Sequence, residues 1–138
     1  MATQIFVNLP VKDLKKSIEF FTKLGFSFNP QFTDKNATCM IIGENIFAML
    51  LVEPFFKTFT KKEICNTKKN IEAILALTVE SRAKVDEMIT KVISAGGAEP
   101  RAPQDHDNMY GRSFEDLDGH SWEVFFMDEK AMKEQSQK

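Results

Sequence analysis

The chain has 138 residues, a formal net charge of −2 and 43% hydrophobic residues. This length fits one domain with a sizeable core, and the composition is that of a globular chain rather than a disordered one. The charge balance provides no basic surface for nucleic acid, and no apolar run reaches the roughly 18 residues that a membrane helix needs. The two cysteines lack metal-type spacing and the N-terminus lacks a signal-peptide pattern, so we expect a reduced, cytoplasmic protein with neither nucleic acid nor membrane as partner.

The first half of the chain predicts a strand, a helix and three further strands. Asp13 is expected to cap the helix, because its carboxylate can accept a hydrogen bond from a free amide of the first turn. Gly25 is expected to end the helix. Short apolar or alternating runs predict the strands, at residues 3–9, 26–32, 37–42 and 46–52.

Residues 53–70 interrupt this pattern with phenylalanines among lysines and threonines. A connector of this length is often a lid, a binding loop or an interaction segment, and a short helix is expected near residues 61–64. Its three phenylalanines either pack as a small satellite core or cover a cavity or a partner surface, and the sequence leaves both readings open.

The second half repeats the order of elements. A helix is expected over 83–95, capped by Ser81 and ended by Gly96 and Gly97. The extended segments are expected at residues 72–79, 98–103, 108–115 and 120–127. We therefore predict an α+β fold of two βαβββ modules. They form one domain over 1–138, with module one at 1–52, a connector at 53–70, module two at 71–127 and a tail at 128–138.

A turn at Asp118 and Gly119 joins the last two predicted strands, since an Asp-Gly pair between apolar runs is a strong hairpin signal. Side chains alternate along a strand, so Trp122 is expected to face the core under the helices. Glu123 then shares the other face with Phe125.

Three segments carry a family resemblance. The first is VNLPVKDL at 7–14 with LGF at 24–26; the second is ALTV at 76–79 with AGG at 95–97; the third is DLDGHSWE at 116–123. On these residues the chain resembles the vicinal oxygen chelate superfamily, which includes glyoxalase I, bleomycin-resistance proteins and extradiol dioxygenases. More narrowly, YGRSFEDLDGH at 110–120 is similar to the bacterial group labelled predicted lactoylglutathione lyases.

The resemblance implies an open, curved mixed sheet with helices on its outer face, a concave face that holds a divalent metal, and a homodimer. It places the four metal-ligand positions at Phe6, Met49, Ile74 and Glu123. Phe and Ile have no donor atom, and the soft Met thioether does not suit Mg²⁺, Mn²⁺ or Zn²⁺. We therefore expect no metal and no other cofactor.

The same placement predicts an apolar cleft that carries a few polar groups. Its candidate lining residues are Phe6, Asn8, Met49, Ile74, Tyr110, Arg112, Glu123 and Phe125. Arg112 is expected either to pair with Glu123 or to clamp an anionic ligand. Glu123 is a general base, a ligand-binding carboxylate or half of a structural pair.

Three classes of function fit these residues. The first is a binder that holds a small apolar or amphipathic molecule without metal, and the residues favour it narrowly. The second is a lyase or isomerase in which Glu123 is the base and Tyr110 or Arg112 the electrophile. The third is a domain whose sheet face binds another protein.

Overall fold

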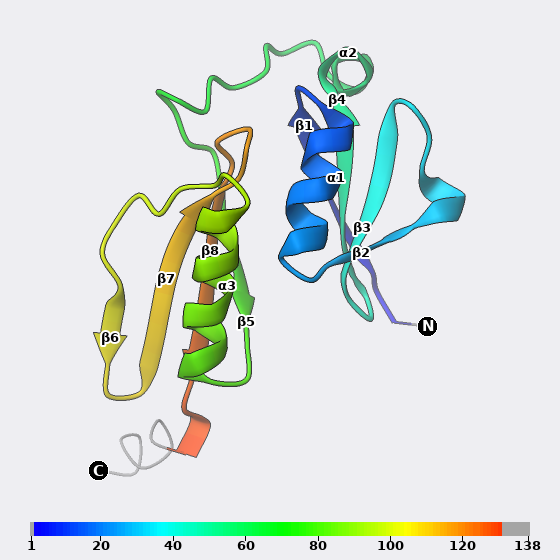
Figure 1. The fold of residues 1–138 in the computed structure, drawn as a ribbon. Coiled ribbons are helices and arrows are strands. Elements are labelled where there is room, and N and C mark those ends of the chain that lie inside the picture. The colour runs from blue at the N-terminus through cyan, green and yellow to red at the C-terminus, as the bar shows by residue number, and fades with distance from the viewer. Residues whose placement is uncertain (1, 131–138) are drawn as a thin grey trace. The chain divides into compact units, whose positions relative to one another are not determined.

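The structure, a computed structural model, describes residues 2–130. The chain divides into two compact units, with the boundary between Asn70 and Ile71 (Figure 1). No helix in the described part of the chain is long and apolar enough to span a membrane.

The first unit contains four strands, one long helix and three short helical turns. Its elements are β1 (Ile5–Val11), α1 (Leu14–Lys23), β2 (Ser27–Asn29), η1 (Pro30–Phe32), β3 (Ala37–Gly43), β4 (Ile46–Val52), α2 (Glu53–Phe56) and η2 (Lys57–Phe59). The strands form one sheet in the order β1-β4-β3-β2. β1 and β4 are parallel, and the other pairs are antiparallel.

The helix α1 forms where the sequence predicts it. The backbone amide of Lys16 donates to the Asp13 carboxylate at 3.1 Å, and Gly25 follows the helix with a φ of 105°. That conformation is easily reached only by a residue without a Cβ atom. Apolar residues at helical spacing then bury one side of α1 against the sheet. The buried residues of this core include Leu9, Val11, Leu14, Phe20, Phe21, Met40, Ala48 and Leu50.

Three predicted boundaries in this unit are wrong. β1 ends at Val11 rather than at residue 9, and Pro10 lies within it because β1 is an edge strand, which tolerates proline. The strand predicted over 26–32 is only β2, since Pro30 begins a 3₁₀ turn. The helix expected near 61–64 is absent there, and the helical turns instead cover residues 53–59.

The described part of the second unit repeats the strand order of the first and contains the helix α3. Its elements are β5 (Ile74–Thr78), α3 (Arg82–Ser94), β6 (Gln104–His106), β7 (Met109–Glu115) and β8 (Ser121–Met127). The sheet order is β5-β8-β7-β6, with β5 and β8 parallel. The predicted strand at 98–103 is wrong: Ala98 makes a single bridge to Glu115, and β6 begins only after the prolines.

The core of this unit lies between α3 and its sheet. Ser81 caps α3 as predicted, accepting a hydrogen bond from the Lys84 amide at 3.2 Å. Trp122 and Val124 are fully buried, which confirms that they face the helix. Figure 1 shows α3 running along this face of the sheet. The other fully buried residues are Val85, Val92 and, at 1% exposure, Ile89 and Phe114.

The predicted α+β fold of two βαβββ modules is therefore confirmed, with one four-stranded mixed sheet in each module and neither sheet closed. The single domain over 1–138 stays a prediction, and the predicted tail 128–138 lies largely outside the described residues.

Candidate functional site

One face of the first sheet packs against α1, and the other points away from it. We call the second one the α1-distal face. Phe6 and Asn8 on β1 and Phe47 and Met49 on β4 lie on it, because Phe6 pairs with Phe47 and Asn8 with Met49. The rings of Phe6 and Phe47 are stacked with centroids 4.7 Å apart. Phe6 is 45% exposed, so this aromatic pair is accessible rather than part of the core. The structure thus brings three predicted cleft residues, Phe6, Asn8 and Met49, onto one face.

The second sheet has a corresponding α3-distal face. It carries the alternate residues of three strands: Ile74, Ala76 and Thr78 of β5; Met109, Gly111, Ser113 and Glu115 of β7; and Ser121, Glu123, Phe125 and Met127 of β8. Ile74, Glu123 and Phe125 therefore share a face, as the sequence predicts. Ile74 is 58% exposed.

Small side chains surround Glu123 on this face. Its cross-strand neighbours are Ala76 on β5 and Ser113 on β7. Gly111 lies diagonally next to it, and a Cβ atom placed on Gly111 would lie 3.5 Å from the Glu123 carboxylate and 3.3 Å from the Cβ of Phe125. The cross-strand neighbours of Glu123 are therefore all short side chains, and Phe125 is its large neighbour along β8.

Two polar groups on this face have no partner among the described residues of the second unit. Within residues 71–130 the Glu123 carboxylate has neither a hydrogen bond nor an ion pair. The Ser113 hydroxyl is buried and has no hydrogen-bond partner in the described structure. A buried hydroxyl without a partner is unfavourable by about 1–3 kcal/mol, so such a group is usually satisfied by water or a ligand.

Tyr110 and Arg112 do not join this face, which corrects the predicted cleft. Arg112 pairs with Val124 across the sheet, so both residues point toward α3. The predicted Arg112–Glu123 pair is wrong. The prediction failed because of the length of the hairpin loop between β7 and β8, which spans residues 116–120. An even-numbered loop, such as the two-residue turn that Asp118 and Gly119 indicate, would shift the register by one and reverse the face.

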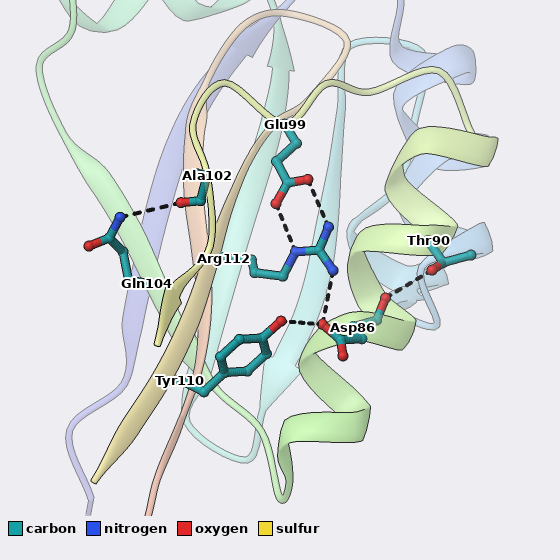
Figure 2. A network of polar contacts seen from close by, with 7 residues as sticks. All are labelled: Asp86, Thr90, Glu99, Ala102, Gln104, Tyr110 and Arg112. Carbon is teal, nitrogen blue, oxygen red and sulfur yellow. Dashed lines mark hydrogen bonds and ion pairs between the residues drawn. The ribbon is translucent and has the colours of Figure 1, made fainter. Parts of the chain in front are cut away.

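Arg112 instead forms a polar network with α3 and the segment before β6 (Figure 2). Its Nε and Nη2 donate to the two carboxylate oxygens of Glu99 at 2.7 and 2.8 Å. Its Nη1 donates to Oδ1 of Asp86 at 2.9 Å, and the Tyr110 hydroxyl donates to the same oxygen at 2.5 Å. The guanidinium of Arg82 lies 5.2 Å from the centre of the Tyr110 ring.

This network holds its charges in ion pairs. The hydrogen bond from Arg112 holds the pKa of Glu99 below its ordinary value, and the hydrogen bond from Tyr110 does the same for the pKa of Asp86. The bond to Glu99 in turn raises the pKa of Arg112. Because two carboxylates already occupy the guanidinium, the network does not offer Arg112 to an anionic ligand.

The four positions that the resemblance assigns to metal ligands are equivalent in the two modules. Phe6 lies two residues before the β1 partner of Met49, and Ile74 lies two residues before the β5 partner of Glu123. Only Glu123 among them carries an oxygen donor, so these residues do not fit a divalent ion. Residues 2–130 also contain no cluster of three or more His, Cys, Asp or Glu side chains that is able to hold one.

Comparison with known proteins assigns the family. A family model described as bleomycin resistance protein-like N-terminal matches residues 3–43. The hypothetical protein SA1046 from S. aureus is 32% identical, with a TM-score of 0.78 over 91% of this chain and 95% of that chain. A glyoxalase/bleomycin resistance protein/dioxygenase family enzyme from Burkholderia phytofirmans PsJN is 15% identical, with a TM-score of 0.76 over 91% and 99%. The chain belongs to the vicinal oxygen chelate superfamily.

A protein described as a binder also has a fold similar to that of this chain. TnmS3, an antibiotic binding protein from Streptomyces sp. CB03234, is 17% identical, with a TM-score of 0.65 over 92% of this chain and 97% of that chain. No curated protein matches the chain. The fold therefore leaves function to be argued from the residues of the two distal faces.

Sequence reasoning missed three residues beside Glu123, namely Ala76, Gly111 and Ser113. The signal was present, because Gly111 and Ser113 alternate with Arg112 and must lie on the face that Arg112 does not occupy. Only the register decides which of those two sets lies beside Glu123.

Proposed function

We propose that this vicinal oxygen chelate protein binds small apolar or amphipathic molecules on its distal sheet faces, and that it does so without a metal ion. The observation that carries the proposal is the pair of apolar side chains exposed where the superfamily would place metal ligands. Phe6 is 45% exposed and Ile74 is 58% exposed. Apolar groups of this size favour contact with an apolar partner over contact with water.

The character of the α1-distal face supports the same function. The stacked rings of Phe6 and Phe47 provide a flat aromatic surface, and Met49 adds a flexible and polarisable side chain. Asn8 is exposed next to them and donates its own amide only to the Phe6 carbonyl, at 3.1 Å. A mainly apolar surface with a few polar groups is typical of small-molecule sites. The antibiotic binding of TnmS3 on a similar fold supports this class of function.

Binding of the neutral aromatic probe 1-naphthalenemethanol tests the proposal, measured by isothermal titration calorimetry. We expect saturable binding that is the same before and after dialysis against EDTA. Phe6→Asp and Ile74→Asp each place a charge on a distal face at an exposed position, so at least one of them is expected to weaken binding. Ile93→Asp is the matched control, because Ile93 is 52% exposed but lies on α3.

Two results would contradict the proposal. One is the absence of saturable binding by folded protein. The other is a tightly held divalent ion in the purified protein whose removal abolishes binding, since a metal site would then exist despite the apolar residues.

A lyase or isomerase with Glu123 as its base is the second candidate, favoured by the unpartnered carboxylate. Tyr110 and Arg112 cannot act as its electrophiles from their observed positions, because they lie on the helix side of the sheet. Turnover of the hemithioacetal of methylglyoxal and glutathione, abolished by Glu123→Gln, would favour this candidate over the binder.

We also propose that the protein forms a homodimer, as the family resemblance implies. Light scattering coupled to size-exclusion chromatography is expected to report twice the mass of one chain, which is 15.8 kDa. A mass of one chain at micromolar concentration would contradict it.

A further inference from the structure

Strands β7 and β8 bring two carboxylates to the α3-distal face, and β5, β7 and β8 bring no Lys or Arg to it. Glu115 and Glu123 both lie on this face, and neither carboxylate has an ion-pair partner within residues 71–130. The one arginine in these strands, Arg112, points toward α3. By contrast, Asp86 and Glu99 on the helix side are both paired with Arg112.

Short side chains flank Glu123 on this face. Its lateral neighbours are Ala76 and Ser113, and its diagonal neighbour is Gly111, so no long side chain stands next to the carboxylate on these sides. The carboxylate presents acceptor atoms only, and the partnerless Ser113 hydroxyl is able to accept one more hydrogen bond. The group that such a site recognises therefore carries several N–H donors and a positive charge.

Apolar residues flank this polar spot along β8. Phe125 is half-buried and lies directly opposite Gly111, and Ile74 lies opposite Ser121, at the start of β8. A ligand with one charged end would place its apolar body against Phe125. The aromatic ring also attracts a cation held near its face.

We propose that Glu123 and Ser113 bind the protonated amine of an amphipathic ligand, whose apolar body packs on Phe125. This inference rests on the proposed small-molecule function and adds the chemical class of the ligand. An anionic ligand would meet two unpaired carboxylates at this place, and a neutral ligand would leave the Glu123 charge without a partner.

Three probes with the same ring system test the charge preference: 1-naphthylmethylamine, 1-naphthalenemethanol and 1-naphthylacetic acid. By isothermal titration calorimetry the amine is expected to bind wild-type protein at least about tenfold more tightly than the alcohol, since a hydrogen bond to a charged group typically contributes that much. The acid is expected to bind more weakly than the alcohol.

Variants identify the residues responsible. Glu123→Gln is expected to lower the affinity for the amine to within about twofold of the affinity for the alcohol, because the amide cannot form an ion pair with the ammonium group. Ser113→Ala is expected to weaken the amine about threefold. Glu87→Gln is the matched control, because it removes the same charge from an exposed position on α3 and is expected to keep the tenfold preference. The urea midpoint of each variant shows whether it is folded.

The outcomes separate this inference from the proposed function. Equal binding of amine and alcohol by wild-type protein, or an amine preference that survives in Glu123→Gln, overturns the amine site but leaves small-molecule binding intact. Failure of all three probes to bind folded protein overturns the proposed function and the amine site together.

Discussion

The indole Nε1 of Trp122 donates a hydrogen bond to Oδ2 of Asp116 at 3.0 Å. The other oxygen of this carboxylate accepts from the backbone amides of Asp118 and His120, each at 3.0 Å. Asp116 is only 7% exposed, so one buried carboxylate holds both the hairpin loop and the buried indole. The β7–β8 register, and with it the face on which Glu123 lies, depends on this loop.

Asp116→Ala is therefore expected to destabilise the protein by about 3 kcal/mol, since one buried and two part-buried donors lose their acceptor at once. Urea unfolding followed by the fluorescence of Trp122, the only tryptophan, measures this change. Asp107→Ala is the control, because Asp107 is exposed in the neighbouring β6–β7 turn and is expected to change stability by less than about 0.5 kcal/mol. Equal effects of the two substitutions would show that Asp116 does not hold the loop.

The partner of Arg112 gives a second prediction. Arg112 and Glu99 are 21% and 20% exposed and form two parallel hydrogen bonds, so their pairing is expected to contribute about 1–2 kcal/mol. A double-mutant cycle of Arg112→Ala with Glu99→Ala measures this coupling in urea unfolding. The corresponding cycle of Arg112→Ala with Glu123→Gln is expected to give none.

An exposed pair provides the comparison for that cycle. Arg82 and Asp105 are 43% and 64% exposed, and their coupling is expected to stay below about 1 kcal/mol. Coupling between Arg112 and Glu123 that exceeds coupling between Arg112 and Glu99 would contradict the observed register.

The same pair predicts a dependence of stability on pH. Arg112 lowers the pKa of Glu99 in the folded protein, so the unfolded chain binds a proton at Glu99 more readily than the folded chain does. This contribution is fully present above the unfolded pKa of about 4.3 and is lost as pH falls through the lower folded pKa. The stability difference between wild type and Arg112→Met is therefore expected to be largest above pH 5 and to shrink toward pH 3.

The prediction concerns the difference between wild type and Arg112→Met, because the pKa shift of Asp116 changes stability with pH in the opposite direction. Burial raises the pKa of Asp116, so its contribution to stability decreases as pH rises through that range. Asp116 is present in both proteins, and its effect cancels in the difference. A stability difference that does not change between pH 6 and pH 3 would show that Arg112 does not shift the pKa of Glu99.

Local sequence rules predicted most of the elements, for identifiable reasons. Asp13 and Ser81 cap α1 and α3 because both lie immediately before amphipathic segments. The alternation of Trp122 with Glu123 fixed their relative faces, since a strand has a side-chain period of two. These arguments need only neighbours in sequence, and the structure confirms them.

The candidate site was harder to predict because it depends on pairing between strands. Tyr110 and Arg112 were correctly placed on one face, but an odd-numbered loop placed that face toward α3. The sequence signal of Asp118 and Gly119 indicated a tighter turn than the one that Asp116 stabilises through its side chain. A one-residue change in loop length moves every side chain of a strand to the other face, and propensities do not encode it.

The small residues beside Glu123 give the last prediction. Gly111 has an ordinary negative-φ backbone, so Gly111→Ala introduces no backbone strain, but its Cβ would lie 3.3 Å from the Cβ of Phe125 and 3.5 Å from the Glu123 carboxylate. Small shifts of these neighbours are expected to cost about 1 kcal/mol of stability. The larger effect is expected on binding of 1-naphthylmethylamine, weakened about fivefold or more, because the added methyl group displaces the Glu123 carboxylate and the Phe125 side chain that bind the amine.

Gly43→Ala is the matched control for this substitution. Its Cβ would meet only the flexible Ile46 side chain, at 3.4 Å, in the first unit. It is therefore expected to leave the amine affinity unchanged at a similar small cost in stability. Calorimetric titration of both variants with the same probe tests this prediction. An amine affinity that Gly111→Ala leaves intact would mean that the ligand does not depend on the positions of Glu123 and Phe125, since these are the side chains that the added methyl group displaces.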